Sequence, residues 1–460
     1  MSQVPKSGSM AGGTPANEYR TRTWRRGRSR MSWDFSTDPE FETQLEWMRD
    51  FVAEEIEPMD LVFRDPAAHV DPVSPAARAM APLKEEVKRR GLWACHLGPE
   101  LGGKGFGQLN LGLMNEILGR SRFAPTVFGT QAPDTGNAEI LARFGTEEQK
   151  QKYLQPLLDG EIVSCYSMTE PQAGSDPGEF TCRAHLDGDE WVIHGEKWFA
   201  SHACIAEFLI VMVITDPDVN VHEGSTMLIV PKGQPGMEIV RNTAVGPKDD
   251  IGGGVHGYIR FTDCRVPERS RLGPVGEGFK VAQSRLGGGR IHHAMRTVGM
   301  LNKAMDYMKE RVVSRSTKGE RLADKQMVQE KIADSYTQIL QFRLHVLYAA
   351  WLLDRDKEYT RAVRREISAI KAAMPGVLKD VVYRALHLHG SLGMSNETPL
   401  MDMWQYVPEM GIVDGPTEVH KIVVAKDILR QVEPHEGPFP SYHVPERIAA
   451  AEAKFADYLD

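Results

Sequence analysis

The spacing of apolar residues changes twice along the chain, and this change limits the folds that the chain can adopt. From about residue 38 to residue 160, apolar residues recur every three or four positions, as on one face of a helix. The period then changes to two, as in half-buried strands, until the helical spacing returns near residue 277. The pattern predicts an α+β protein with an N-terminal helical domain (32–160), a middle β domain (161–276), a C-terminal helical domain (277–432) and a tail helix (433–460).

Cap and turn residues bound many of the expected elements. Thr146 precedes two acidic residues and Gly160 closes the same segment, so residues 146–160 are expected to form a complete helix. Strands are expected at Trp191–Gly195, Phe208–Thr215, Thr226–Pro231 and Gly257–Val266. Further helices are expected at Ile291–Val313, Lys325–Asp356, Tyr359–Gly390, Gly415–Gln431 and Val444–Leu459.

The net charge of −8 hides an uneven distribution of charge. The first 30 residues carry a balance of +6, which leaves −14 on the rest of the chain. Residues 1–31 are rich in Gly, Ser, Pro and Arg without an apolar period, so a disordered basic extension is expected. A transit peptide, a tag remnant and a start codon placed before Met31 are alternative interpretations. The acidic body argues against nucleic acid as a ligand.

Composition excludes several other classes of protein. The longest strongly apolar stretch, Phe208–Thr215, is much shorter than the ~18 residues of a membrane-spanning helix, so no membrane span is expected. The five cysteines are odd in number and form no CxxC pair, which argues against a disulfide scaffold or a zinc ribbon. A reducing compartment is therefore expected: the cytoplasm of a bacterium, or a mitochondrion or peroxisome in a eukaryote.

Four polar segments could carry chemistry. Tyr166–Pro177 and Gly195–His202 combine hydroxyls, glycines and aromatics that suit a flat polar heterocycle or a phosphate, although turn capping and strand packing explain the same residues. Arg315–Gln326 is either a phosphate clamp near a helix start or a solvated charge run. Asp414 precedes a Gly-Pro turn, where it is either a desolvated base or the cap of the following helix. The histidine pairs, such as His292–His293, lack a carboxylate partner at metal-ligand spacing, so no metal site is predicted.

Taken together, these segments resemble the acyl-CoA dehydrogenase family over residues 38–432. Five segments match in family order and at family spacing. Tyr166–Asp176 (YSMTEPQAGSD) resembles the family's flavin loop, and Trp198–Ser201 resembles its second flavin segment. Arg315–Gln326 resembles the segment that reaches FAD across a subunit interface. His387–Gly393 resembles the adenosine-end segment, and Val413–Glu418 resembles the catalytic segment. The resemblance implies an N-terminal helical domain, a middle β-barrel or sandwich domain and a C-terminal four-helix bundle.

The resemblance also implies FAD as the cofactor and identifies the residues of the site. The residues implied at FAD are Tyr166, Met168, Thr169, Gly174, Ser175, Phe199, Ser201, Arg315, Thr317, Gln326, His387, Gly390, Ser391, Pro416 and Glu418. The residues implied at the acyl-CoA are Ser175, Arg290 and Gly415. The chain departs from the usual family residue at Phe199 (Trp), Ser201 (Thr), Lys318 (Phe), His387 (Gln), Ser391 (Gly) and Gly287, where some members carry an Asp that binds CoA.

Asp414 stands where the family carries its catalytic Glu, and the resemblance implies that it removes the α proton of the substrate. Its side chain is one methylene shorter and reaches about 1.5 Å less far. A misplacement of about 1 Å can lower a rate ~100-fold, so something must compensate for the shorter side chain. The surrounding Asp-Gly-Pro-x-Glu-Val-His resembles the mammalian family members ten and eleven and their bacterial relatives, which act on long or branched acyl chains.

The reaction implied by the resemblance is FAD-dependent α,β-dehydrogenation of an acyl-CoA thioester to the trans-2-enoyl-CoA, in fatty-acid or branched-acyl catabolism. The implied partners are an electron-transfer flavoprotein as electron acceptor and further copies of the chain in a homodimer or homotetramer. Two alternatives remain: an oxygen-using acyl-CoA oxidase or related flavin oxidase, and a non-enzymatic flavoprotein on the same fold. The retained carboxylate and the acidic body argue against the second alternative.

Overall fold

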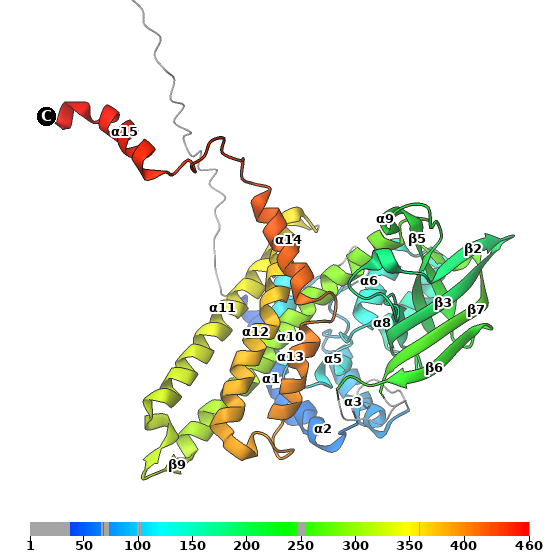
Figure 1. Cartoon of the computed structure of the whole chain (residues 1–460). Helices are drawn as coiled ribbons and strands as arrows, with labels where there is room; N and C mark the ends of the chain where they lie inside the picture. Colours follow the sequence, from blue (N-terminus) through cyan, green and yellow to red (C-terminus); the bar gives the residue numbers. More distant parts are fainter. Residues whose placement is uncertain are drawn as a thin grey trace, which may run out of the picture. The chain divides into compact units, whose positions relative to one another are not determined.

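The computed structural model describes residues 37–459, except residues 66–67, 69–72, 99–100, 102, 247–253 and 358 (Figure 1). The basic extension expected at residues 1–31 lies outside the described residues. The chain divides into two compact units, Met1–Thr43 and Gln44–Asp460. In the first unit the carboxylate of Asp38 accepts a hydrogen bond from the N–H of Phe41 at 2.9 Å and caps the start of α1 (Pro39–Phe51). The second unit holds the remaining elements.

The first part of the second unit is helical, as the apolar spacing predicts. It contains η1 (Val52–Ile56), α2 (Glu57–Val62), α3 (Pro75–Arg89), α4 (Gly107–Leu118), α5 (Ala124–Val127), α6 (Asp134–Phe144), α7 (Glu147–Gln149), η3 (Lys150–Leu154) and α8 (Gln155–Asp159). Both ends of the helix expected at 146–160 are confirmed. The Thr146 hydroxyl and the Gln149 amide form a reciprocal capping box, and Gly160 ends the helix at φ 74°. The middle turn, η3, is π-helical and was not expected.

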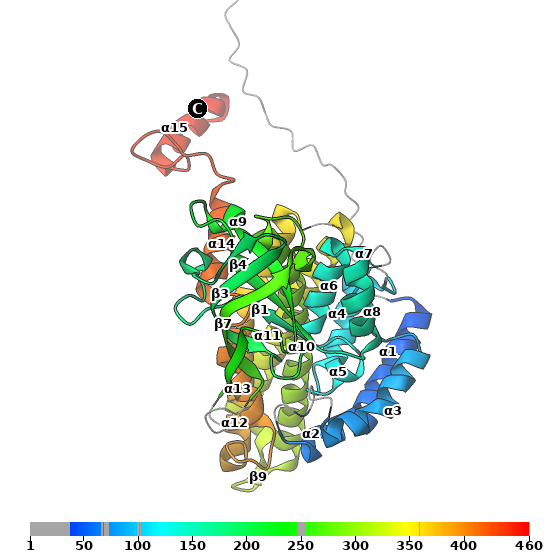
Figure 2. The same ribbon diagram turned by 90° about the vertical axis from the view of Figure 1, so that its right-hand side faces the viewer.

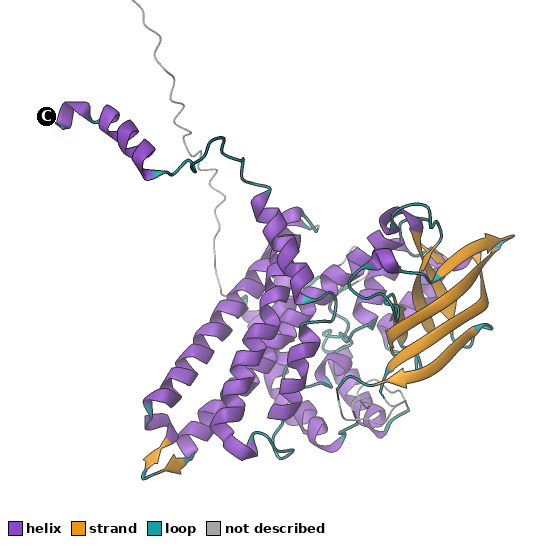
Figure 3. Ribbon diagram, viewed as in Figure 1, coloured by secondary structure: helices purple, strands orange, loops and turns teal. Residues whose placement is uncertain are grey.

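The middle part forms a sheet, drawn in orange in Figure 3. Among the described residues this sheet has eight strands in the order β6-β7-β3-β1-β4-β5-β8, and β2 pairs with β3 and β4. The strands are β1 (Ser164–Ser167), β2 (Arg183–Asp187), β3 (Glu190–Ser201), β4 (Phe208–Ile214), β5 (Ser225–Pro231), β6 (Met237–Thr243), β7 (His256–Pro267) and β8 (Arg271–Leu272). The expected strands are all present. The segment Gly195–His202, expected between two strands, lies within β3 as far as Ser201, because β3 continues through a bulge between Lys197 and Ala200.

Both faces of the sheet are buried around β4, because its side chains alternate between two clusters. Phe208, Ile210 and Met212 pack in a cluster that includes residues of α6, α8 and α10. Leu209 and its alternate neighbours pack in a second cluster with residues of β1, β2, β3 and β7. Since β1 runs parallel to β4, this burial also fixes the strand that leads into the polar loop after Ser167.

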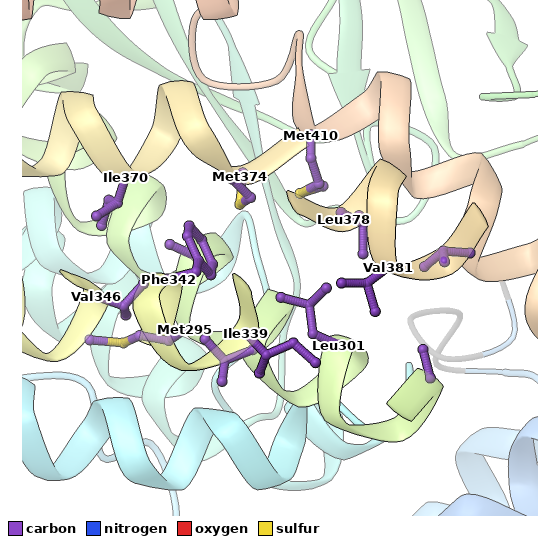
Figure 4. Packing of buried hydrophobic residues seen from close by; sticks show 14 of the residues in the cluster. Met295, Leu301, Ile339, Phe342, Val346, Ile370, Met374, Leu378, Val381 and Met410 are labelled. Carbon is purple, nitrogen blue, oxygen red and sulfur yellow. The ribbon is translucent and has the colours of Figure 1, made fainter. Parts of the chain in front are cut away.

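Long helices form the last part of the second unit. They are α10 (Gly278–Ser314), α11 (Gln326–Asp356), α12 (Arg361–His389), α13 (Leu400–Met410) and α14 (Thr417–Leu429). The shorter elements are α9 (Val221–Gly224), the hairpin of β9 (Ser316–Thr317) and β10 (Glu320–Arg321), and α15 (Val444–Lys454). Helix α13 was not expected. Its Met410 belongs to the same core of buried apolar side chains as Met295 of α10, Phe342 of α11 and Met374 of α12 (Figure 4).

Helix α10 joins the parts of the second unit. It contacts α4 and α6 among the N-terminal helices, β5 of the sheet, and α11 and α12 among the long helices (Figure 2). Residues on successive turns of α10 therefore face different parts of the molecule. In the described part of the chain, no helix is both long enough and apolar enough to cross a membrane. The five cysteines are unpaired thiols.

Candidate active site

Asp414 lies in the short connection between α13 and α14, with its backbone in the left-handed region that few non-glycine residues adopt. Its φ is 55° and that of Gly415 is 106°. Positive φ costs free energy for a non-glycine residue, so the surrounding contacts must hold it. The carbonyl oxygen of Asp414 accepts a hydrogen bond from Nε of Arg290 at 2.8 Å and lies 3.3 Å from Nε2 of His420. These two side chains fix the peptide group that follows the carboxylate-bearing residue.

The rest of this connection is anchored through its carbonyl groups. Nζ of Lys371, a fully buried side chain on α12, donates to the carbonyl of Met410 at 2.5 Å. The N–H of Thr417 donates to the carbonyl of Gly411 at 3.0 Å. Burial lowers the pKa of Lys371 to about 8, while the nearby Asp414 carboxylate acts in the opposite direction. The connection is therefore held at both ends and in the middle.

The Asp414 carboxylate points at α10. Its Oδ2 lies 3.6 Å from Nε2 of His293, and the Asp414 side chain is 14% exposed. A methyl group added at Gly289 would lie only 2.9 Å from the same oxygen, so the carboxylate occupies space that a side chain at position 289 would fill. Two residues earlier, a methyl group at Gly287 would lie 2.5 Å from the ring of Tyr359. The Tyr359 ring therefore fills the place where some family members carry the CoA-binding Asp.

A network of buried, hydrogen-bonded polar side chains extends from β1 toward the region of Asp414. The guanidinium of Arg285 lies 3.9 Å above the ring of Tyr166, and its Nε donates to Asn137 at 3.0 Å. Asn137 donates to the hydroxyl of Ser164 at 2.8 Å, which in turn donates to the carboxylate of Asp134 at 2.5 Å. Burial raises the pKa of Asp134 to about 6, against the effect of these hydrogen bonds. Burial and the nearby Asp414 carboxylate both raise the pKa of Tyr166.

The loop after Tyr166 is fastened to β3 by a buried ion pair. Nζ of Lys197 lies 2.8 Å from Oε1 of Glu170 and also donates to the carbonyl of Met168 at 2.7 Å. The carbonyl of Thr169 accepts from the N–H of Trp198 at 3.0 Å. Further along the loop, a methyl group at Gly174 would meet nothing within 4 Å, and the next residue, Ser175, is exposed. The loop thus presents open space and a free hydroxyl.

The second aromatic segment lies beside the first. Tyr166 of β1 is paired directly with Ser201 of β3, so the two segments meet where these two interior strands pair. The bulge in β3 places Phe199 at φ 52°, with 44% of the residue exposed. Its ring meets that of Trp198 edge-on at 4.8 Å between centroids. The Ser201 hydroxyl lies 2.9 Å from Nδ1 of His256.

The residues brought together where β1 and β3 pair suit a ligand with a flat, polar ring system. An exposed aromatic held in a strained conformation offers a stacking surface, and adjacent hydroxyl and backbone groups offer hydrogen bonds. The open position at Gly174 and the exposed Ser175 leave room for an elongated ligand to continue past the ring. FAD has this shape and polarity, so these side chains and backbone groups are compatible with FAD binding.

Six of the other expected FAD residues, from two segments, lie at the opposite end of the long helices. Arg315 follows the end of α10 and is 25 positions from Arg290, which corresponds to roughly 37 Å along a helix. Thr317 lies in β9 and Gln326 begins α11 (Figure 1). All three residues of this segment are exposed. His387, Gly390 and Ser391 lie at the end of α12, where the His387 ring meets Tyr383 at 4.3 Å. Pro416 and the exposed Glu418, by contrast, start α14 next to Asp414.

Comparison with known proteins places these features in a family. The description "Acyl-CoA dehydrogenase, N-terminal domain" matches residues 38–161, "Acyl-CoA dehydrogenase, middle domain" matches 165–264, and "Acyl-CoA dehydrogenase, C-terminal domain" matches 276–429. The probable acyl-CoA dehydrogenase FadE2 of Mycobacterium tuberculosis is 42% identical over 348 residues, which cover 75% of this chain and 84% of that protein. The chain belongs to the acyl-CoA dehydrogenase family.

Further acyl-CoA dehydrogenases agree with this assignment. Acyl-CoA dehydrogenase family member 10 of Mus musculus is 38% identical over 388 residues, which cover 83% of this chain and 36% of the mouse protein. The chain thus spans little more than a third of that relative. The butyryl-CoA dehydrogenase of Megasphaera elsdenii has a solved structure that superposes with a TM-score of 0.73 at 27% identity, covering 86% of this chain and all of that one. A Mycobacterium abscessus protein named for the same family reaches 0.78 at 35% identity, covering 86% of this chain and all of that protein's chain.

Several residues around Asp414 and the loop after β1 were not expected from the sequence. Gly289 and His293 of α10 face Asp414, Lys371 and His420 hold its connection, and Glu170 with Lys197 fastens the flavin-loop segment. The sequence carried one signal for the first pair, a glycine run followed at helical spacing by the His292–His293 pair, but this pair was considered only as a metal site, and no metal site was predicted. In the structure the two neighbouring histidines point to different surroundings, since His292 is buried near Arg296 and His293 faces Asp414.

Proposed function

We propose that the protein catalyses FAD-dependent α,β-dehydrogenation of an acyl-CoA thioester to the trans-2-enoyl-CoA, with Asp414 as the base that removes the α proton. The observation that carries this proposal is the position of Asp414. Its carboxylate is mostly buried, lies near Tyr166, and is presented by a connection anchored at three carbonyl groups. A carboxylate held in this way, beside aromatic side chains and polar groups, suits proton abstraction next to a flat cofactor.

The residues that would hold FAD within one chain fall into three groups. Tyr166, Met168, Thr169, Phe199 and Ser201 would contact the ring system, and Gly174 with Ser175 would accommodate the phosphates or the CoA portion of the substrate. The start of α14, with Pro416 and Glu418, would complete the site near the ring. When bound, the oxidised flavin supplies the acceptor for the hydride that leaves the β carbon.

The chain's own contribution is to orient the thioester and take its α proton. Charge develops on the thioester oxygen as the proton leaves, so a hydrogen-bond donor at that oxygen lowers the barrier. Among the described residues, none accepts a backbone hydrogen bond from the N–H of Asp414, so this donor is available beside Gly415. Arg290 would then act by fixing the Asp414 peptide, because its Nε is already used on the carbonyl of Asp414.

The hairpin residues require a second copy of the chain if they contact FAD. Arg315 lies roughly 37 Å from Arg290 along the direction of α10, and Thr317 and Gln326 follow it in β9 and at the start of α11. His387 is 16 positions beyond Lys371, roughly 24 Å along α12. Both sets would serve an FAD bound by a partner subunit, in a homodimer or homotetramer. An electron-transfer flavoprotein would accept the electrons, in the cytoplasm of a bacterium or in a mitochondrion or peroxisome of a eukaryote.

A visible spectrum of the purified protein, titrated anaerobically with a panel of acyl-CoAs, tests this function. We expect flavin absorbance that is bleached by one class of acyl chain, and at least ~100-fold slower bleaching for Asp414→Asn, because the base is removed. Asp187→Asn, an exposed carboxylate on β2 paired with Arg265, is the matched control and should bleach at the wild-type rate. Absence of flavin, or full activity of Asp414→Asn, would overturn the proposal. Peroxide formed in air would identify an oxidase instead.

A further inference from the structure

We propose that Gly289 and His293 of α10 form a seat that positions the shortened carboxylate of Asp414, with His293 as the positioning residue. The inference rests on the proposed role of Asp414 as the base. It answers how an Asp can work where one more methylene is usual. The two seat residues are four positions apart, so they lie on the same face of the helix one turn apart.

The first part of the seat is space. Oδ2 of Asp414 would lie 2.9 Å from a methyl group at position 289, closer than such contacts can be. Only a residue without a side chain lets the carboxylate lie directly against the α10 backbone. The neighbouring Gly288 serves a different group, because a methyl group there would lie 2.9 Å from Glu139 rather than from Asp414. The contact at Gly289 is therefore specific to the carboxylate.

The second part of the seat is a polar group that faces the same oxygen. Nε2 of His293 lies 3.6 Å from Oδ2 of Asp414, longer than a hydrogen bond but within reach of a small rotation of either side chain. Distances between catalytic groups are often long without substrate and shorten in the complex. The Asp414 oxygen thus has one wall at Gly289 and one polar neighbour at His293.

The backbone cannot make this adjustment, because it is already fixed. Arg290 and His420 both approach the carbonyl of Asp414, and Lys371 holds the carbonyl of Met410. The remaining freedom of the carboxylate lies in its own side-chain rotation. One group that faces one carboxylate oxygen, here His293, is sufficient to select one rotamer of the Asp414 side chain. The other carboxylate oxygen is then left directed to the substrate.

The charge state of His293 suits a positioning role. Burial lowers its pKa to about 4, the Asp414 carboxylate acts in the opposite direction, and Arg296, Lys371 and Arg285 lower it further. The imidazole is therefore neutral at neutral pH, so it can donate one N–H from Nε2 without giving a proton to the carboxylate. A protonated imidazole at this distance would instead compete with the substrate for the negative charge.

The test uses the full-length holoprotein and compares His293→Leu with His293→Gln. Leucine removes the polar group, whereas the Nε2 of glutamine stands near the position of the imidazole Nε2. Two readouts are needed: the rate of flavin bleaching by the most active acyl-CoA of the panel, and exchange of the substrate's α protons with D2O, followed by mass spectrometry. Exchange reports the base directly and does not depend on the flavin being reduced. FAD content and acyl-CoA affinity are measured alongside.

We expect His293→Leu to slow both bleaching and exchange at least 10-fold, with FAD content and acyl-CoA affinity within 2-fold of wild type, and His293→Gln to recover most of the loss. Wild-type rates in the leucine variant, or equal losses in both variants, would overturn the role of His293. If the leucine variant does not fold, His293→Asn replaces it, because its amide is too short to reach the same position. Asp414→Asn separates the two hypotheses: unchanged exchange in that variant contradicts the base itself.

Discussion

Nζ of Lys197 lies 2.8 Å from Oε1 of Glu170, and neither side chain is exposed to solvent. The Glu170 carboxylate also accepts hydrogen bonds from the N–H groups of Thr181 at 2.6 Å and Cys182 at 3.1 Å. Lys197 in turn donates to the carbonyl of Met168. The pair therefore connects the loop after β1 with the strand that carries Trp198–Ser201, the two segments to which FAD contacts are assigned.

Replacing one member of this pair should be more harmful than replacing both. Lys197→Met leaves a buried carboxylate without its cation, and such a change destabilises a protein by about 3–5 kcal/mol. We expect a loss of this size in urea unfolding and a lower ratio of flavin to protein. The double variant Glu170→Gln/Lys197→Met should recover part of both. A single variant that loses less than about 1 kcal/mol would show that water reaches the carboxylate.

Gly289→Ala should separate stability from catalysis. The added methyl group would meet the movable end of the Asp414 side chain, so the carboxylate should rotate away while the fold adjusts little. Alanine also favours the helix by about 1 kcal/mol relative to glycine. We expect an unfolding free energy within about 1 kcal/mol of wild type, and α-proton exchange at least 10-fold slower.

The matched control is Gly376→Ala on α12. A methyl group at this exposed helical position would meet nothing within 4 Å. The same helix gain of about 1 kcal/mol is expected there, with exchange and flavin bleaching unchanged. Equal exchange rates in the two glycine variants would mean that the carboxylate does not need the space at position 289.

The features that local sequence determines were the ones that could be predicted. Thr146 and Gly160 bound their helix through groups within a few residues, and the four apolar strands follow their own period. Strand β6, with Met237, carries mostly polar, partly exposed residues at the edge of the sheet and shows no such period. Helix α13 is short, and the Asn396–Pro399 break before it obscured its start.

The site was predictable only as far as it follows the order of family segments. The paired positions of Tyr166 and Ser201 agree with the two flavin segments of the resemblance. The contacts of Asp414 with α10 join residues more than 120 positions apart, and local periodicity carries no information about such pairs. Burial of Lys197 is equally invisible in the sequence, because lysines are mostly exposed.

Asp354 should contribute to stability by capping a helix of another part of the fold. Its two carboxylate oxygens accept from the N–H groups of Gln108 at 2.6 Å and Leu109 at 2.8 Å, in the first turn of α4. Asp354→Ala leaves both donors without this partner and should lower the unfolding free energy by about 1–2 kcal/mol. Asp354→Asn retains one acceptor and should lose less. Glu330→Ala is the control, because Glu330 is exposed and lies on α11, the helix that carries Asp354. This variant should change stability by less than about 0.5 kcal/mol.

The pH dependence of stability should change when His96 is replaced. Burial lowers the pKa of His96 to about 3 from its ordinary value of 6.5, and the charge of Arg296 acts in the same direction. Among the described residues, neither ring nitrogen of His96 has a hydrogen-bond partner. As the pH falls below 6.5, the unfolded chain binds a proton at this position and the folded chain does not. The unfolding free energy of the wild type therefore falls with pH in this window.

His96→Leu removes this titration, so its stability relative to wild type should rise by up to about 1.4 kcal/mol for each pH unit below 6.5. Urea unfolding at pH 7, 5.5 and 4.5 measures this difference, and other titrating groups cancel because both proteins share them. His96→Gln, which also cannot titrate, should show the same slope even if its packing lowers its stability at every pH. A difference that is constant across the three pH values would mean that the folded protein protonates His96 as readily as the unfolded chain does.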